Sequence, residues 1–562
     1  MSCALWQENC SRPMSVRSDL VERRYFLHQV GSKRHVVPTW GESWRHPGAT
    51  SLDADSHLRL RGGDAGKTGG GYMAEMIIVI DEGTTSTRTM LFAADGTPLG
   101  SAQREIRQHY PGPGLVEHDA AEIWEATLAC TREMVARAGG ADHVAAIGIT
   151  NQRETIVFWD RATNEPLAPA IVWQDRRTSA DCAALKEAGH ETAVQATSGL
   201  LLDPYFSGSK IGWALRHWPQ LKDAGARLAV GTIESWLVYR LTGGVHVTDA
   251  TNASRTALMA IEGEGGWNAG LCDLFGVPMR LLPEITGCTT VVGTTDPALF
   301  GGAIAIAGIA GDQQAATIGQ ACLSPGQTKA TFGTGAFILS ASGATRRHSS
   351  NRLLATVLVQ EGDARVYALE GSVFVAGSLI KWLRDGLGLL ASASESEGLA
   401  RAVPDNGGVY LVPALSGLGA PHWRPDALAA LSGLSFASTK AHVARAALEA
   451  QSYQAHDLKS AFAADGVDWA ELRIDGGMAA NDWMAQDLAD MLDLTVERPD
   501  FVESTALGAA MLAATGAGIY PDLKTAAQAM RGTATRFTPA LDATQRKTRL
   551  AGWQSALAKV LG

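Results

Sequence analysis

Residues 76–94, MIIVIDEGTTSTRTMLFAA, contain two strand-like runs joined by a turn of Gly and hydroxyl residues. The apolar runs at 76–80 and 89–94 predict buried strands, and the Gly-Thr-Thr segment between them predicts a tight turn. An Asp-Gly turn at 95–96 and a third run of alternating polar and apolar residues follow. The sequence therefore predicts that a β-meander opens the folded part of the chain.

Outward from this stretch, strand and helix signals alternate. A helical period covers residues 120–138, and the short apolar run VAAIGIT at 144–150 predicts another strand. A second strand, Gly-Thr turn and strand, ATFGTGAFILSAS, lies at 330–342. The repetition predicts an α/β protein with two similar halves, each opening on a hairpin.

Length and composition limit the class of protein. The chain has 562 residues, of which 46% are hydrophobic and 19% charged, so it is long enough for two large cores. Its formal charge is −10 and no dense Lys/Arg block is present, which argues against a polynucleotide partner. The longest charge-free stretches of small apolar residues, 300–310 and 505–520, are shorter than the roughly 18 residues that a membrane span needs. We interpret both as buried elements.

The seven cysteines are scattered, odd in number and without a CxxC pair. This pattern argues against a disulfide framework and against a zinc site. It is typical of a reducing compartment, and we expect a cytoplasmic protein.

Residues 1–75 differ from the rest, because they contain no sustained apolar period and are predicted not to fold. They have the character of neither a mitochondrial presequence nor a secretory signal. The simplest hypothesis is that translation starts at Met73 or Met76. The segment GGDAGKT at 62–68 resembles a P-loop, but the motif needs Gly where Arg61 stands.

Two Gly-Thr turns are candidates for phosphate binding. In DEGTTSTR, residues 81–88, an apolar strand ends in a carboxylate, and the backbone N–H groups of the following turn can surround phosphate oxygens. Asp81 would face a Mg²⁺ ion. One such turn can be purely local, but a second one at 333–335 gives each half a hairpin that could clamp ATP.

Two polar clusters follow apolar strands and are candidates for acceptor binding. In GIAGDQQAA, residues 308–316, Asp312 is either a helix N-cap, the commoner role, or a general base. In TNQRETIVFWD, residues 150–160, the polar residues either form a solvated loop or bind a polyol. Hydroxyl groups both donate and accept hydrogen bonds, so a polyol site needs a donor such as Arg153 beside an acceptor such as Glu154.

From about residue 77 to its end the sequence resembles the FGGY family of carbohydrate kinases, and within it the glycerol kinases. The resemblance rests on these segments: DEGTTSTR, YPGPGLVEHD at 110–119, ITNQRET at 149–155, IVWQDRRT at 171–178, DPYFSGSK at 203–210, VTDATNASRT at 247–256, GDQQAA at 311–316, FGTGAF at 332–337, PALSGLGAPHW at 413–423, ALSGLSFASTKAHVARAALE at 430–449 and DGGMAAN at 475–481. NQRE and DPYFSGSK separate glycerol kinases from the pentose and gluconate kinases of the family.

The resemblance implies a fold of two ribonuclease H-like domains, as in actin and hexokinase, with the active site in the cleft between them. An N-terminal domain at 76–318 would bind glycerol and carry the first phosphate hairpin. A C-terminal domain at 319–562 would bind the nucleotide, and the Ala- and Gly-rich segment 506–518 is expected to form a close-packed helix near the sheet of that domain. The implied reaction is the transfer of the γ-phosphoryl group of ATP to glycerol, giving sn-glycerol 3-phosphate, with Mg²⁺ as cofactor and closure of the cleft expelling water.

The resemblance also assigns the site residues. Asp312 would be the general base, with Asp81 near Mg²⁺, either directly or through a bridging water. The residues implied on the glycerol side are Arg153, Glu154, Tyr205, Gln313, Trp173, Phe337 and Thr84. Those implied on the nucleotide side are Thr84, Thr85, Ser86, Arg88, Thr334, Gly377, Lys381, Gly477 and Asn481.

Some positions depart from the family. Glu82 and Lys381 stand where Gln is common, and the loop at 287–309 lacks the Lys and Arg of members inhibited by fructose 1,6-bisphosphate. Inhibition by that sugar is therefore not expected. A homo-oligomer, dimer or tetramer, is expected. Two alternatives remain: an FGGY kinase for another polyol or ketose, such as erythritol or xylulose, and a non-catalytic ATP-binding protein, which need not keep Asp312.

Overall fold

Residues 76–263 and 265–562 are described by a computed structural model. The predictions made for residues 1–75, namely the absence of folding, the P-loop-like segment and the start at Met73 or Met76, lie outside the described residues.

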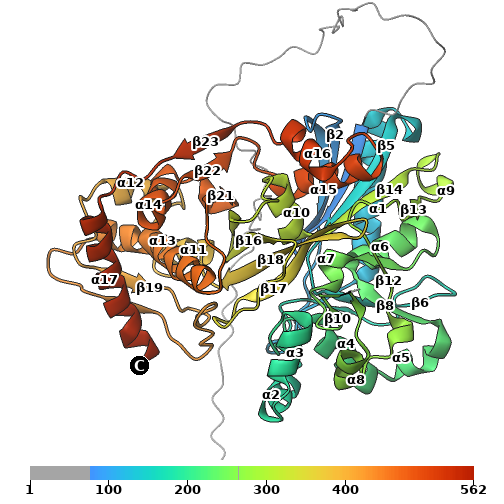
Figure 1. Ribbon diagram of the computed structural model, residues 1–562, viewed down its shortest axis with the longest axis horizontal. Helices are drawn as coiled ribbons and strands as arrows, with labels where there is room; N and C mark the ends of the chain where they lie inside the picture. Colours follow the sequence, from blue (N-terminus) through green and yellow to red (C-terminus); the bar gives the residue numbers. More distant parts are fainter. Residues whose placement is uncertain (1–75, 264) are drawn as a thin grey trace, which may run out of the picture. The chain divides into compact units, whose positions relative to one another are not determined.

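A six-stranded mixed sheet organises the N-terminal half, with the order β13-β14-β5-β1-β2-β3 (Figure 1). The antiparallel hairpin of β1 and β2, followed by antiparallel β3, is the predicted meander, and β5 and β14 extend the sheet in parallel on the other side of β1. The strands are β1 Met76–Glu82, β2 Ser86–Ala93, β3 Pro98–Glu105, β5 Val144–Asn151, β13 Gly293–Thr294 and β14 Ala305–Gly311.

A seven-stranded sheet organises the C-terminal half, with the order β17-β18-β16-β15-β21-β22-β23. Its inner strands β18-β16-β15-β21-β22 repeat the directions and order of β3-β2-β1-β5-β14. The prediction of two similar α/β halves is confirmed, and the order is that of ribonuclease H-like domains. The strands are β15 Gln327–Phe332, β16 Ala336–Gly343, β17 Leu354–Glu361, β18 Ala364–Val373, β21 Glu471–Asp475, β22 Val496–Pro499 and β23 Ala534–Phe537.

Smaller sheets accompany the large ones. One four-stranded sheet has the order β4-β7-β6-β8, and three strand pairs join β9 to β12, β10 to β11 and β19 to β20. Their bounds are β4 Glu117–His118, β6 Ile156–Asp160, β7 Ala170–Ile171, β8 Leu228–Thr232, β9 Val247–Asp249, β10 Met259–Ala260, β11 Gly266–Trp267, β12 Glu284–Thr286, β19 Tyr410–Val412 and β20 Ala430–Ser432.

The helices connect these strands, and the helix predicted at 120–138 is confirmed as α1. Asp119 caps its start by accepting a hydrogen bond from the backbone N–H of Ala121, and Gly139 ends it with φ 91°. The helices are α1 Ala120–Ala138, α2 Ser179–Glu187, α3 Glu191–Ser198, α4 Ser207–His217, α5 Pro219–Ala224, α6 Ile233–Thr242, α7 Ala250–Ala253, α8 Ala269–Phe275, α9 Pro297–Phe300, α10 Asp312–Gly319, α11 Gly377–Asp385, α12 Glu395–Arg401, α13 Lys440–Ala464, α14 Asp482–Leu492, α15 Ser504–Gly516, α16 Leu523–Met530 and α17 Ala543–Leu561. Within the described ranges, no helix is long and apolar enough to cross a membrane.

Strand β1 is apolar on both faces because it separates two cores. Ile78 and Ile80 join the core that includes α1, whereas Ile77 and Val79 join the core that includes α15. This division follows from the alternation of side chains along a strand. The continuous apolar run at the start of the folded part therefore reflects a sheet covered by helices on both sides (Figure 1).

The Ala- and Gly-rich helix expected beside the sheet of the nucleotide domain is placed differently by the structure. This helix, α15, packs against α10 and against β1, β5 and β14 of the N-terminal sheet. A Cβ on Gly148 of β5 would lie 2.4 Å from the carbonyl oxygen of Ala509, so only glycine permits the approach. The interpretation of the segment as a close-packed helix is confirmed, but its assignment to the C-terminal sheet is wrong.

Candidate active site

The first Gly-Thr turn joins β1 to β2 and presents small polar residues. The Gly83 N–H donates to the carbonyl oxygen of Ser86 at 3.0 Å, which closes the turn. The hydroxyl of Ser86 accepts a hydrogen bond from Gln103 at 2.9 Å, and Thr85 is exposed. The turn therefore has the small side chains and accessible backbone that a phosphate group requires.

Asp81 and Arg88 lie opposite each other at the base of this turn. Their ion pair measures 2.8 Å, and Arg88 also contacts Glu503, just before α15, at 2.6 Å. Burial raises the pKa of Asp81, and the Arg88 guanidinium opposes that rise. Arg88 therefore links the first hairpin to the helix supplied by the C-terminal half.

Glu82, one of the departures from the family pattern, is fully buried. Its Oε2 accepts hydrogen bonds from Thr87 at 2.6 Å and Thr127 at 3.2 Å. Burial raises the pKa of Glu82 to about 8, against the effect of these two hydrogen bonds. The side chain is therefore mostly protonated and neutral at pH 7, as the Gln common at this position would be.

The second Gly-Thr turn joins β15 to β16 and contacts the start of α11. The N–H groups of Gly377 and Ser378 donate to the carbonyl oxygens of Gly333 and Thr334 at 2.9 Å and 3.1 Å. A Cβ on Gly377 would lie 3.5 Å from Met478 Cγ, which places this turn beside the segment that contains Gly477. The structure thus brings together three of the residues predicted on the nucleotide side, Thr334, Gly377 and Gly477.

Two other predicted nucleotide residues have roles that the structure partly explains. Asn481 is the N-cap of α14, and its Oδ1 accepts the Met484 N–H at 2.9 Å. Lys381 is exposed on α11 and interacts electrostatically with Asp385, one turn further along. Contact of either residue with a nucleotide stays a prediction.

Asp312 follows β14 directly and is the first residue of α10. The N-cap of this helix is Gly311, so the alternative in which Asp312 is the N-cap is not the one that the structure adopts. The carboxylate lies 3.3 Å from Nε of Arg153, and one third of the side chain remains exposed. Burial raises the pKa of Asp312, while Arg153 and Lys329 oppose the rise. A carboxylate with a raised pKa that remains accessible suits a general base.

Arg153 and Glu154 belong to a buried cluster of charges. Arg153 donates two hydrogen bonds to Glu370 of β18, at 2.7 Å and 3.2 Å, and Glu154 pairs with Arg255 at 2.7 Å. Arg255 also binds Glu370, at 3.0 Å. Glu154 has φ 62°, a left-handed conformation that is uncommon for a residue with a side chain. The cluster fixes this strained position and joins the two halves of the fold.

The predicted aromatic residues extend the cluster toward the first hairpin. Trp173 donates from Nε1 to the hydroxyl of Thr84 at 3.0 Å, and its ring meets that of Tyr205 edge to face at 5.6 Å. The Arg255 guanidinium lies 5.6 Å from the centre of the Tyr205 ring. Thr84, Trp173 and Tyr205 are therefore connected to the cluster around Glu154.

Gln313 is held from the C-terminal sheet by Lys329. Nζ of this buried lysine on β15 donates to Oε1 of Gln313 at 2.8 Å. Burial lowers the pKa of Lys329, whereas the nearby carboxylates of Asp475 and Asp312 raise it. Phe337 is half-buried on β16, opposite Thr331, and its assignment as an apolar wall of the site stays a prediction.

The charged residues that contact the predicted set but were not predicted from the sequence include Arg255, Glu370, Lys329 and Lys210. Burial lowers the pKa of Lys210 to about 8, and its Nζ donates to the carbonyl oxygen of Tyr205. Glu370 and Lys329 each interrupt a strand whose neighbouring residues are apolar or small. A charged residue between apolar or small neighbours in a strand was the available signal, because a buried charge requires a partner.

The residues present fit an ATP–Mg²⁺ complex. A Cβ on Gly477 would meet no atom within 4 Å, so its Cα borders open space, as a nucleotide-binding surface requires. Oδ1 of Asp81 has no hydrogen-bond partner within residues 76–263 and 265–562, and 13% of the side chain is exposed. A single carboxylate with a free oxygen is a suitable Mg²⁺ ligand, because protein-bound Mg²⁺ usually keeps several waters and phosphate oxygens.

Known proteins resemble the chain along most of its length. The N-terminal and C-terminal domains of the FGGY family of carbohydrate kinases match residues 76–319 and 328–517. The glycerol kinase of Rhodospirillum centenum is 53% identical over 486 residues, which are 86% of this chain and 97% of that protein. The crystal structure of Plasmodium falciparum glycerol kinase with ADP is 33% identical, with a TM-score of 0.82, and covers 88% of this chain and 100% of its own. The xylulose kinase of Rhodospirillum rubrum is 25% identical, with a TM-score of 0.76, and covers 86% and 99%.

These similarities agree with the strand order that is repeated in the two large sheets. The resemblance drawn from the sequence motifs and the predicted two-domain fold are thereby confirmed. The chain belongs to the FGGY family of carbohydrate kinases.

Proposed function

We propose that this protein is an ATP-dependent glycerol kinase that transfers the γ-phosphoryl group of ATP to a terminal hydroxyl of glycerol. The observation that carries the proposal is the position of Asp312, accessible at the end of β14 and held at 3.3 Å by Arg153. The glycerol kinases among its relatives support the choice of substrate. The alternative substrates are another small polyol or a ketose, since the xylulose kinase of R. rubrum shares the fold.

On the acceptor side, Asp312 removes the proton from the attacking hydroxyl. Because burial raises the pKa of Asp312, this carboxylate is a stronger base than an exposed aspartate and is better suited to accept a proton near neutral pH. Arg153 and Glu154 supply a donor and an acceptor for the remaining hydroxyl groups, while Tyr205 and Gln313 contribute further hydrogen bonds. Trp173 and Phe337 cover the carbon atoms. Since Glu370 fixes Arg153, the donor is positioned before glycerol arrives.

On the nucleotide side, we assign Thr84, Thr85, Ser86 and Arg88 to the phosphates, together with Thr334 of the second hairpin. Gly377, Lys381, Gly477 and Asn481 would lie near the adenosine. Asp81 would hold Mg²⁺, directly or through a water. When bound, Mg²⁺ neutralises phosphate charge and aligns the γ-phosphoryl group for transfer.

The substrate proposal is tested by ADP release with Mg²⁺ and either glycerol, erythritol, xylulose or no acceptor. We expect turnover with glycerol to exceed turnover with the other acceptors clearly. Faster turnover with another acceptor would leave the kinase assignment intact but contradict the choice of glycerol. If no acceptor stimulated ADP release, the non-catalytic alternative would replace the proposal.

Lys329→Met is expected to lower kcat about tenfold and to move the acidic limb of its pH profile to higher pH. The lysine opposes the rise in the pKa of Asp312, so its removal keeps Asp312 protonated up to a higher pH. The measurement is kcat between pH 5 and 9, with Lys440→Met as the control. Lys440 pairs with Glu395 on the surface, and its loss should leave the limb in place. An unchanged acidic limb in Lys329→Met would contradict the role of Lys329.

Fructose 1,6-bisphosphate at millimolar concentration is expected to leave the activity unchanged. Two phosphate groups require cations, and the segment at 287–309 contains neither Lys nor Arg. A coupled assay with and without the sugar bisphosphate checks this expectation. Strong inhibition would show that another segment supplies the cations.

We infer a cytoplasmic enzyme, and the five cysteines of the described residues, all free and buried, support a reducing compartment. A dimer or tetramer and the absence of a nucleic-acid partner stay predictions. Gel filtration with light scattering tests the first of these.

A further inference from the structure

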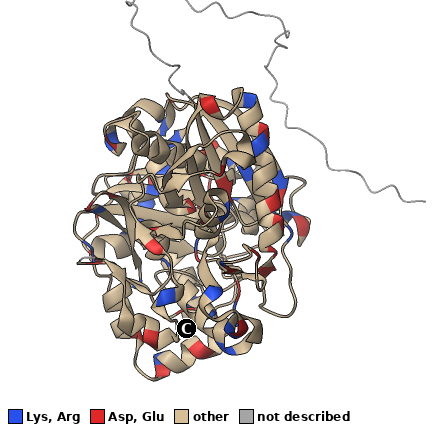
Figure 2. Cartoon of the chain, turned by 90° about the vertical axis from the view of Figure 1, so that its right-hand side faces the viewer, with Lys and Arg blue, Asp and Glu red and all other residues tan. Residues whose placement is uncertain are grey.

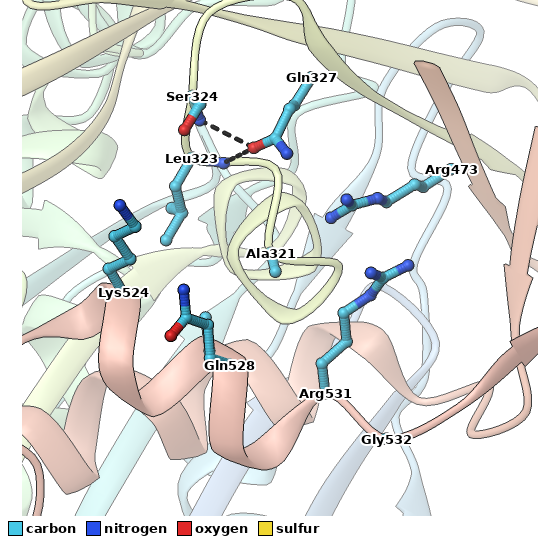
Figure 3. A pocket seen from close by; sticks show the side chains of 10 residues that line it. Ala321, Leu323, Ser324, Gln327, Arg473, Lys524, Gln528, Arg531 and Gly532 are labelled. Carbon is cyan, nitrogen blue, oxygen red and sulfur yellow. Dashed lines mark hydrogen bonds between the residues drawn. The ribbon is translucent and has the colours of Figure 1, made fainter. Parts of the chain in front are cut away.

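A cavity of about 330 Å³ lies apart from the predicted active site. Figure 3 shows Arg473 and Arg531 on one side of it, with Lys524 and Gln528 on the other. Ser324 and Gln327 add polar groups, while small apolar patches come from Leu323, Ala321 and Ala527. None of its lining residues belongs to the set predicted for glycerol or nucleotide.

The charges that line the cavity are all positive. Among the described residues that form its wall, Arg473, Lys524 and Arg531 are cationic and none is an Asp or Glu. Carboxylates hold the two arginines from outside the wall, where Glu497 contacts both and Glu471 contacts Arg473. Lys524 is exposed on α16, where it interacts electrostatically with Asp522 but makes no side-chain hydrogen bond with any described residue. The chain as a whole has a net charge of −10, and acidic and basic residues are intermingled in the view of Figure 2. The cationic wall of the cavity is therefore a local feature.

The arginines also retain donor capacity. Nε of Arg531 is buried and makes no hydrogen bond with any described residue, whereas Nε of Arg473 makes no such bond but lies 3.4 Å from Oε2 of Glu497. Nη1 of Arg473 donates to the carbonyl oxygen of Gln320, and Nη2 of Arg531 to Glu497. The cluster therefore contains more donor groups than its protein acceptors satisfy. Buried donors without acceptors cost free energy. An oxyanion with several oxygens would correct this excess by a small adjustment of the side chains.

The walls of the cavity come from three separate parts of the fold. The segment from the end of α10 to the first residue of β15 supplies Leu323, Ser324 and Gln327. Strand β21 of the C-terminal sheet supplies Arg473, and α16 supplies Lys524 and Gln528. Helix α16 contacts α15, and its Met530 lies against Gly96 in the turn between β2 and β3 of the N-terminal sheet. A ligand would therefore touch the connection between the halves and elements attached to both.

We propose that this cavity is a second binding site, for a small phosphate monoester. The volume is at the lower end of the range of ligand pockets, which suits a triose or hexose phosphate rather than a nucleotide. The phosphate group binds Lys524 and the two arginines, whose planar, charged donors match its oxygens. Gln528, Ser324 and the apolar patch of Leu323 and Ala527 contact the carbon skeleton and its hydroxyl groups.

The site also contacts the end of the helix that begins at Asp312. Gln320, whose carbonyl oxygen accepts from Arg473, follows α10, and its Nε2 donates to Asp475 at 3.1 Å. Asp475 in turn interacts electrostatically with Lys329, which also interacts with Asp312. Hydrogen bonds and electrostatic interactions thus connect the cavity to the predicted base, although the two sites share no residue.

The test is calorimetric titration of the full chain with glucose 6-phosphate, and it requires no catalytic activity, so its failure is separate from a failure of the proposed function. We expect saturable binding to the wild-type protein and at least a tenfold weaker affinity for Lys524→Glu. Gln528→Glu, also exposed on α16, should weaken binding in the same direction. Lys222→Glu on α5, an exposed lysine with the same change of charge, is the matched control and should bind as the wild type does.

Several results would overturn the proposal. These are the absence of saturable binding up to about 10 mM glucose 6-phosphate, equal affinity of the wild type and Lys524→Glu, and equal binding of uncharged glucose. Inorganic phosphate is the remaining probe, and we expect it to bind more weakly than the monoester because it lacks the carbon skeleton. Equal affinity for inorganic phosphate would contradict the assignment of a monoester.

Discussion

Asp312→Asn is expected to lower kcat for glycerol phosphorylation by roughly 10²–10⁴-fold, with a much smaller effect on nucleotide binding. The amide has nearly the shape of the carboxylate and can still accept the Gln313 N–H, which donates to Oδ1 at 2.7 Å. It cannot, however, take a proton from the attacking hydroxyl. The loss therefore reports proton transfer rather than folding. The measurement is steady-state ADP release at saturating glycerol, with ADP affinity determined separately.

Asp296→Asn is a suitable control for this change. Asp296 caps α9, and its Oδ1 accepts the Ala298 N–H at 2.9 Å, so the same substitution again preserves a side-chain acceptor for a backbone donor. We expect its kcat to stay within about twofold of the wild type, as for a surface change away from the site. If Asp312→Asn retained more than about a tenth of the wild-type kcat, Asp312 would not be the base.

The hairpins could be predicted because their signals are local. Strand, turn and strand lie within a few neighbouring residues, and β1 with β2 and β15 with β16 were found where the Gly-Thr turns predicted them. The partner of α15 could not be predicted in this way. A helix whose residues are small and apolar on every side is predicted to be buried, but this pattern does not indicate which sheet the helix packs against. Gly148, the glycine that allows α15 to approach β5 closely, lies far from α15 in the sequence.

The residues of the candidate site were predictable only in part, for the same reason. Sequence motifs predicted four of these residues: Arg153, Glu154, Tyr205 and Asp312. The structure connects them through ion pairs and a ring contact. Glu370 was not predicted from the sequence, because 217 positions separate it from Arg153. No local pattern relates the two residues, since their pairing is created when the two halves meet. Their roles in binding and catalysis stay predictions.

Glu370→Gln is expected to destabilise the protein by roughly 3–5 kcal/mol, the effect of removing one partner from a buried ion pair. The side chains of Glu370 and Arg255 are 0% exposed and that of Arg153 is 2% exposed, so both guanidinium groups would remain buried without their shared carboxylate. The amide cannot replace it, because its NH₂ group would face a cation. Urea unfolding followed by tryptophan fluorescence measures the loss. Glu397→Gln, which breaks the exposed pair with Arg401, should cost less than about 1 kcal/mol.

The pH dependence of unfolding separates the charge of Glu370 from its packing. Burial alone would raise its pKa, but Arg153 and Arg255 outweigh that effect and hold the pKa at about 2, below the ordinary value of 4.5. A group with a depressed pKa stabilises the folded state above its unfolded pKa, and this stabilisation is lost as the pH falls from about 4.5 toward 2. The difference between wild type and Glu370→Gln should therefore be largest near neutral pH and shrink in acid. A difference below about 1 kcal/mol at pH 7, or one that does not change with pH, would mean that the ion pair does not hold the two halves together.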